Sequence, residues 1–197
     1  MGRHFIGLSI LMVFLSTLPV SAGAPLDTVQ TNINKVLDVL RDPKLKTESA
    51  KEIKKEKLDA LYEQLFDEVE LSRRSLGGNW NKLNPAQRQE FIHLYRQMLE
   101  KAYLDRILSY TNEKIVFSKE IMLSNNQAEV QAKLITSSRE IPVFCRVIQK
   151  DGVWKVYDVG AENVSLVQNY RSQFNSILAN HTPDQMLEML RKKVEGQ

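Results

Sequence analysis

The chain has 197 residues, of which 43% are hydrophobic and 26% charged, and its formal net charge is +3 at pH 7. So weak a positive charge does not indicate nucleic-acid binding, and the sequence contains no RNA- or DNA-binding motif. Its single cysteine, Cys145, excludes an intramolecular disulfide, and with it the class of small disulfide-stapled domains.

The N-terminus has the order of a secretory signal peptide. Arg3 precedes an apolar run over 5–18, and small residues follow as far as Ala24. The apolar run is too short to span a bilayer with margin. We predict a signal peptide over 1–22, because cleavage after Ala24 would leave a proline at the new terminus. The mature chain, 23–197, is then a single exported domain without a transmembrane span, and its one cysteine fits a Gram-negative periplasm.

Helical spacing of apolar residues predicts two helices at the start of the mature chain, over 26–40 and 49–65. The first ends before Pro43, because the residue that precedes a proline avoids helical geometry. Lysines of the second helix are interleaved with glutamates, which favours a solvated face over a surface for lipid headgroups or a partner. A short third helix is expected to end at Gly77, since glycine tolerates a left-handed cap.

A long helix begins at Asn84, which is placed to cap it, with Pro85 in the first turn and Gln87 placed to reach back. It has two adjacent apolar faces. The first face consists of Phe91, Tyr95, Met98 and Ala102, and the second of Ile92, Leu99, Tyr103 and Ile107. Together they are wider than the apolar stripe of an ordinary surface helix. We therefore expect this helix to contact apolar groups on more than one side.

After Tyr110 the apolar period changes from helical spacing to two. Turn signals divide the region into four strands, over 114–123, 127–136, 140–150 and 153–160. The short connections require antiparallel neighbours. Arg146 and Lys155 are expected to face outward, so the residues on either side of each are expected to face inward. Helices over 164–180 and 183–194 close the chain. The predicted class is α+β, with helices packed on one face of a four-stranded antiparallel sheet.

Residues that carry chemistry are few. His93 and His181 have no second metal-binding side chain at ligand spacing, so no metal site is predicted. No phosphate-binding glycine loop or nucleophile elbow is present, and no cofactor is predicted. Asp158, beside Tyr157, is the one candidate general base, but its place before a helix favours a role in binding backbone N–H groups. Cys145 is interpreted as a small buried apolar group.

Two longer stretches stand out as motifs, "LGGNWNKLNPAQRQEFIHLYRQMLEKAYLDRILSY" at 76–110 and "GVWKVYDVGAENVSLVQNYRSQF" at 152–174. The first carries Leu76, Gly77, Trp80, Pro85, Gln87, Arg88, Phe91, Leu99, Tyr103 and Tyr110. The second carries Trp154, Tyr157, Asp158, Val164, Ser165, Leu166, Tyr170, Arg171 and Phe174. At this spacing they resemble the MlaC family, the periplasmic phospholipid-binding components of the Mla lipid-transport system, also called the toluene-tolerance family. Asn163 departs from the glycine that family members usually have there.

The resemblance implies a curved four-stranded antiparallel sheet with helices packed on one face, enclosing an apolar lipid cavity. It implies a carrier of phospholipid, not an enzyme, that shuttles lipid between an inner-membrane ABC-transporter complex and an outer-membrane lipoprotein complex and so serves outer-membrane lipid asymmetry. The resemblance and the inward faces together predict lipid contacts from Tyr95, Met98, Leu99, Tyr103, Ile107, Val130, Ala132, Leu134, Val143, Trp154, Val156, Leu166, Val167, Tyr170 and Phe174.

Three alternatives stay open on the sequence. The cargo could be another lipid, such as a hopanoid. The chain could be an enzyme of the ketosteroid-isomerase-like type that uses Asp158. It could also be an adaptor that binds partner proteins without lipid.

Overall fold

The computed structural model describes residues 24–110 and 113–196, so the predicted signal peptide lies outside the described residues. The chain is an α+β structure, as predicted. Its helices are α1 (Ala24–Arg41), α2 (Lys51–Leu65), α3 (Glu68–Leu76), α4 (Pro85–Leu108), α5 (Leu166–Leu178) and α6 (Pro183–Glu195). Its strands are β1 (Lys114–Ser124), β2 (Gln127–Ile135), β3 (Glu140–Lys150), β4 (Val153–Ala161) and β5 (Val164–Ser165). Among the helices of these ranges, none has the length and apolar character that a bilayer crossing requires.

One antiparallel sheet joins the strands in the order β1-β2-β3-β4-β5, so the prediction of four strands is corrected to five. The two-residue β5 is too short for alternation to reveal it. It forms because the chain reverses at Glu162 and Asn163, where φ is 50° and 66°, and Val164 then pairs with Ala161. Asparagine is one of the few residues besides glycine that tolerate this left-handed geometry, which explains how Asn163 replaces the usual glycine.

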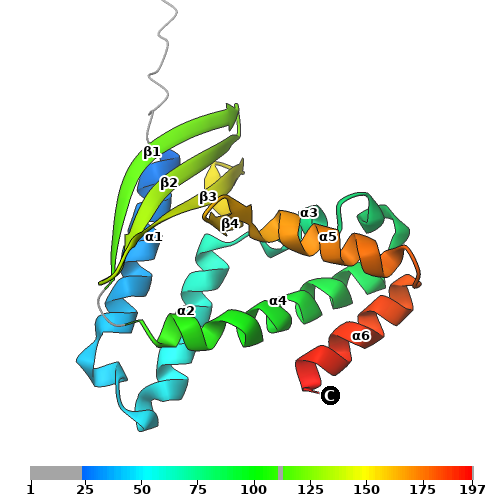
Figure 1. The fold of residues 1–197 in the computed structure, drawn as a ribbon, viewed down its shortest axis with the longest axis horizontal. Coiled ribbons are helices and arrows are strands. Elements are labelled where there is room, and N and C mark those ends of the chain that lie inside the picture. The colour runs from blue at the N-terminus through cyan, green and yellow to red at the C-terminus, as the bar shows by residue number, and fades with distance from the viewer. Residues whose placement is uncertain (1–23, 111–112, 197) are drawn as a thin grey trace, which may run out of the picture.

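The sheet is strongly curved, and α1 lies against its concave side (Figure 1). Val130, Val147 and Val156 form a buried cluster on this side with Val29 of α1 and Leu65 of α2. Val147 pairs with Val156 across β3 and β4, and Val130 pairs with Cys145, two residues from Val147, so the ladder places all three side chains on one face. α1 and α2 therefore form the helical layer that covers the sheet.

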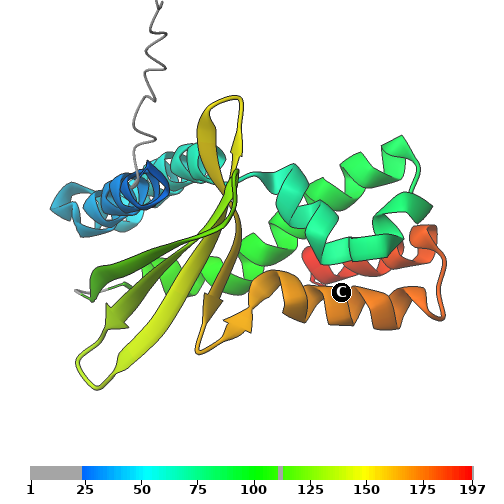
Figure 2. The same cartoon turned by 90° about the horizontal axis from the view of Figure 1, so that it is seen from above.

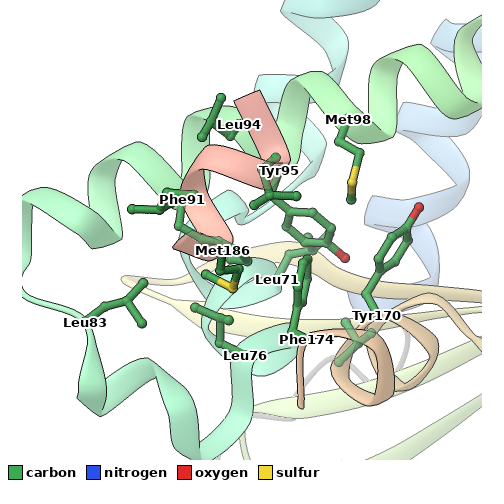
Figure 3. Packing of buried hydrophobic residues seen from close by; sticks show 13 residues of the cluster. Leu71, Leu76, Leu83, Phe91, Leu94, Tyr95, Met98, Tyr170, Phe174 and Met186 are labelled. Carbon is green, nitrogen blue, oxygen red and sulfur yellow. The ribbon is translucent and has the colours of Figure 1, made fainter. Parts of the chain in front are cut away.

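A second apolar core lies beyond the end of the sheet formed by β4 and β5, where α3, α4, α5 and α6 pack together (Figures 2 and 3). Its centre is aromatic: the ring centroids of Phe91 and Phe174 are 5.1 Å apart and those of Tyr95 and Tyr170 are 5.2 Å apart, both pairs edge to face. Such pairs add to the free energy of burial. The Tyr95 hydroxyl lies 3.0 Å from Ser75 Oγ, so its buried oxygen is hydrogen-bonded. This cluster of rings fixes the four helices to one another.

The helix ends follow the signals in the sequence. Asn84 Oδ1 accepts a hydrogen bond from the Gln87 backbone N–H, and Gln87 Oε1 accepts one from the Asn84 N–H, both at 2.9 Å. Thr182 and Gln185 form the same reciprocal box at the start of α6. Helix α3 ends at Gly77 with a φ of 55°, in the left-handed region that favours glycine. The predicted cap of the long helix and the predicted end of the short one are confirmed.

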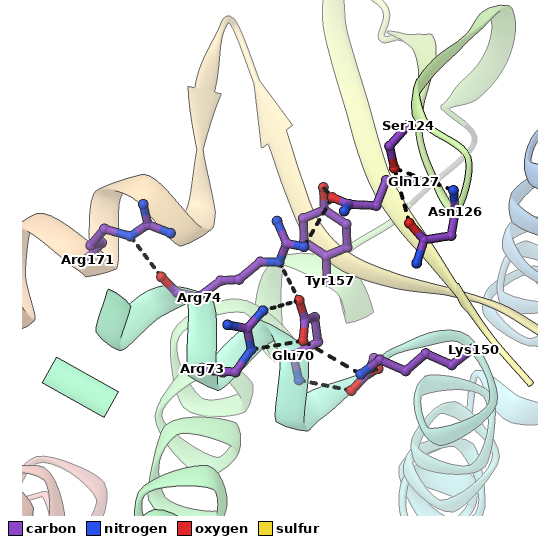
Figure 4. A network of polar contacts seen from close by, with 10 residues as sticks. Glu70, Arg73, Arg74, Ser124, Asn126, Gln127, Lys150, Tyr157 and Arg171 are labelled. Carbon is purple, nitrogen blue, oxygen red and sulfur yellow. Dashed lines mark hydrogen bonds and ion pairs between the residues drawn. The ribbon is translucent and has the colours of Figure 1, made fainter. Parts of the chain in front are cut away.

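A network of charged side chains joins α3 to the sheet (Figure 4). Glu70 is its centre: Arg73 Nη2 and Arg74 Nε each lie 2.6 Å from Glu70 Oε1. Arg74 also stacks over the ring of Tyr157, 3.8 Å from the centroid. Burial alone would raise the pKa of Glu70, but the hydrogen bonds from the two arginines outweigh it and lower the pKa to about 2.

We expect Glu70→Gln to lower the melting temperature at pH 7 and to have little effect near pH 2. The ordinary pKa of a glutamate, about 4.3, describes the unfolded chain, and the folded pKa is lower, so ionised Glu70 stabilises the fold above pH 4.3 by on the order of 3 kcal/mol. That contribution is lost as the pH falls through the folded pKa of about 2. Melting curves between pH 7 and pH 2 measure it, with Glu188→Gln, in an exposed ion pair, as the matched control. An unchanged gap between variant and wild type across this range would contradict the assignment.

Candidate functional site

A hollow of about 610 Å³ lies between α1, α2, α4 and the sheet. The helical spacing of leucine, isoleucine and valine puts an apolar stripe of each helix on this wall. Its apolar residues include Ile33, Val36, Leu37 and Leu40 of α1, Leu58, Leu61 and Leu65 of α2, Leu99, Leu104 and Ile107 of α4, and Ile115 and Leu134 of the sheet. Such a wall offers dispersion contacts and no specific polar recognition, which suits hydrocarbon.

A second hollow of about 410 Å³ adjoins the first. The residues that line both are Ile33, Tyr103, Ile115, Val159 and Leu166. The second hollow continues along the sheet, where Phe117, Val130, Ala132 and Val143 line it. Leu166, the first residue of α5, belongs to both walls because the corner between β4 and α5 brings the start of this helix against the sheet.

Polar groups border the first hollow where α4 ends and β1 begins. Arg106, Ser109, Tyr110 and Glu113 line this end. The Tyr110 hydroxyl accepts hydrogen bonds from Arg41 Nε at 3.1 Å and Nη2 at 2.8 Å, and it donates one to the Glu113 carbonyl at 2.6 Å. An amphiphile with its chains in the hollow would find charged and hydroxyl groups at this rim.

The described residues hold no group of three or more histidine, cysteine or acidic side chains that could bind a metal ion. Cys145 lines the second hollow, and burial raises the pKa of its thiol to about 12. At neutral pH this thiol is protonated and therefore a poor nucleophile.

Asp158 lies at the corner between β4 and α5, where it binds backbone and hydroxyl donors. Its carboxylate accepts hydrogen bonds from Ser165 Oγ at 2.6 Å and from the Val167 N–H at 3.0 Å. Arg146 Nη1 lies 3.2 Å away. The side chain is buried and belongs to the wall of neither hollow. The predicted role of Asp158 at the start of this helix is confirmed.

The structure divides the residues predicted for lipid contact into two groups. Those on the walls of the hollows are Leu99, Tyr103, Ile107, Val130, Ala132, Leu134, Val143 and Leu166, of which Val130 also belongs to the buried cluster under α1. Those packed in the two clusters of core side chains are Tyr95, Met98, Trp154, Val156, Val167, Tyr170 and Phe174. Alternation and helical spacing tell which side chains point inward, but they do not distinguish a filled interior from a hollow one. Lipid contact by the wall residues stays a prediction.

Helices α1 and α2 contribute wall residues that the sequence analysis did not include. Ile33, Leu37 and Leu61 are examples. The signal was present, because these residues belong to the apolar stripes that predicted the two helices. By itself such a stripe indicates only helix formation, since nothing in it shows whether it faces a protein side chain or a ligand.

The comparisons with known proteins place this fold in a family. The family model described as MlaC protein matches residues 30–192. An intermembrane phospholipid transport system binding protein MlaC from Haemophilus influenzae is 25% identical over 122 residues, which cover 59% of this chain and 57% of that protein. A phospholipid-binding protein from Ralstonia solanacearum, solved in complex with a phospholipid, superposes with a TM-score of 0.78 at 19% identity, over 88% of this chain and 97% of that one. The chain belongs to the MlaC family.

Proposed function

We propose that this protein is a periplasmic carrier that holds the acyl chains of a phospholipid in the two adjoining hollows. The observation that carries the proposal is the apolar lining of both hollows together with the polar rim near Tyr110. The names of its relatives in Haemophilus and Ralstonia, which refer to phospholipid transport and phospholipid binding, support the choice of ligand.

The size of the hollows fits two chains. A methylene is about as large as a water molecule, whose share of liquid volume is about 30 Å³. On that measure, hollows of about 610 and 410 Å³ hold on the order of 20 and 14 methylenes. A lipid with two ordinary acyl chains has roughly thirty, so we assign one chain to each hollow.

The energetic need for such a carrier follows from the hydrophobic effect. Each methylene exposed to water costs about 0.8 kcal/mol, so a lipid with thirty of them meets a barrier on the order of 24 kcal/mol between two membranes. A lining as apolar as the bilayer removes most of this barrier. The protein then needs an affinity comparable to that of the membrane, and no covalent chemistry.

A carrier of this kind needs partner proteins at both membranes. The resemblance to the Mla system supports an inner-membrane ABC-transporter complex and an outer-membrane lipoprotein complex as the proteins that exchange lipid with this carrier. Residues 1–22 would export the chain to the compartment between them.

We expect the protein to purify with phospholipid bound. Native mass spectrometry of protein isolated from the periplasm should show an added mass, and extraction with organic solvent should identify it as phospholipid. A hopanoid in the extract would support the alternative cargo. Bare protein that also takes up no lipid from liposomes would contradict the carrier function and leave the adaptor alternative.

A further inference from the structure

The wall of the first hollow between α2 and α4 differs from the walls that α1 makes with α2 and with the sheet. Close packing joins α1 to α2, α1 to the sheet and α4 to α6, but α2 and α4 are not among the helix pairs that pack closely in the described chain. Ion pairs between charged side chains join α2 to α4. Lys55 Nζ lies 2.8 Å from Glu100 Oε1, and Arg96 Nη1 lies 3.1 Å from Glu63 Oε1.

Arg96 is the centre of this crossing. Besides Glu63 it faces Asp59, with 3.8 Å between Nη2 and Oδ1, and its guanidinium lies 5.1 Å from the ring centroid of Tyr62. Nη1 is also 2.9 Å from Glu68 Oε1, a buried oxygen, in a geometry that does not make a hydrogen bond. One arginine of α4 thus faces acidic groups along α2 and at the start of α3.

The same side chains belong to the hollow. Asp59, Arg96 and Glu100 line it together with the leucines of α2 and α4. At the far end of α4, the Arg41–Tyr110 hydrogen bonds join the end of α1 to the segment after α4. The helical hairpin of α1 and α2 is therefore held to α4 by polar contacts at three successive positions.

We propose that the α2–α4 seam is the opening through which acyl chains pass, and that Arg96 and Lys55 set its rate by latching it. This inference rests on the carrier function proposed above. Opening any closely packed wall would expose buried apolar side chains to water, whereas opening this seam mainly separates partly exposed ion pairs, which are individually weak and screened by salt. Both residues are positioning residues for entry and need not contact the cargo.

The proposal predicts a faster transfer of lipid when the latch is weakened. The measurement is the release of a fluorescent phosphatidylcholine from loaded protein to vesicles of phosphatidylcholine, which carry no net charge, so that salt acts on the protein and not on membrane attraction. We expect Arg96→Gln to release lipid about fivefold or more faster than wild type. Raising the salt concentration from 50 mM to 500 mM should accelerate wild type more than the variant, which keeps only the Lys55–Glu100 ion pair across the seam.

Arg191→Gln is the matched control, because Arg191 forms ion pairs with Glu90 and Glu188 on the α4–α6 side, away from the hollow. It should release lipid at the wild-type rate. A second test does not depend on Arg96: Lys55→Glu should accelerate release, and adding Glu100→Lys to it should restore the slow rate. Melting curves of each variant confirm that the proteins compared are folded.

The outcomes separate the two proposals. If wild type and variants all load with lipid and release it at equal rates that do not depend on salt, the latch is overturned and the carrier function stays intact. Failure of the wild type to load with lipid at all would overturn the carrier function, and the latch with it. Acceleration by Arg191→Gln as large as that by Arg96→Gln would also overturn the latch, since it would show a general loosening of the helices.

Discussion

Ala132→Asp is expected to remove bound lipid, whereas Lys133→Asp is expected to leave it in place. Ala132 is buried on the wall of the second hollow, between Phe117 of β1 and Val143 of β3 in the ladder. A carboxylate there would face acyl chains without a partner, which costs several kcal/mol or forces the group to take up a proton. A loss of about 3 kcal/mol corresponds to roughly 100-fold weaker binding.

Lys133→Asp is the matched control, because it also places an aspartate on β2 but on the opposite face. Lys133 is the next residue of β2, points to solvent and forms an exposed ion pair with Glu140, 2.8 Å apart. Its replacement by aspartate changes a solvated face only, so bound lipid should stay within about twofold of wild type. Lipid per protein is measured by mass spectrometry of extracts, and circular dichroism with a melting curve verifies the fold. Equal lipid in two folded variants would mean that this face does not contact the cargo, and the reverse ranking would indicate a one-residue slip of register.

Asp158→Asn is expected to destabilise the protein strongly without abolishing lipid exchange. The substitution removes the charge that Arg146 faces at 3.2 Å and weakens the acceptor of the Ser165 and Val167 hydrogen bonds. Arg146 keeps Glu129 at 3.0 Å, so the main loss is the charge-assisted hydrogen bonds from Ser165 and Val167, on the order of 3 kcal/mol. For a domain of this size that lowers the melting temperature by about 6 to 12 °C.

The enzyme alternative makes the opposite prediction for the same variant. If Asp158 were a general base, a folded Asp158→Asn protein would lose a measurable turnover of a small substrate at a temperature well below its melting point. Asp184→Asn serves as the control, because Asp184 accepts its hydrogen bond from Gln87 on the exposed side of α4 and α6. Retained lipid exchange by Asp158→Asn at low temperature supports a structural role for this carboxylate.

Much of the fold could be predicted because its signals are local. Caps such as Asn84 and Thr182 fix where helices begin, and alternation along β2 fixes which side chains face the helices. The short β5 could not be predicted in this way. It depends on the reversal at Glu162 and Asn163, and two residues carry no period.

The candidate site could be predicted only in part, for a different physical reason. Tyr95 and Tyr103 both lie on α4 at apolar positions of the helical pattern, yet one is buried among aromatic rings and the other lines both hollows. Side chains of α5 and α6 enclose Tyr95, whereas Tyr103 is hydrogen-bonded to Tyr170 of α5 and still faces both hollows. Such information belongs to the tertiary arrangement, and no single-helix pattern contains it.

The separation of the ring cluster of α3–α6 from the hollows has a consequence for the empty protein. A lipid carrier spends part of each transfer cycle without lipid, and the apolar walls of the hollows then face water. The Phe91, Tyr95 and Phe174 rings contact one another and line neither hollow, so their contribution to folding is the same with or without bound lipid. The core of α3–α6 thereby stabilises the fold while the hollows between α1, α2, α4 and the sheet contain no lipid. Release of lipid then need not cause the protein to unfold.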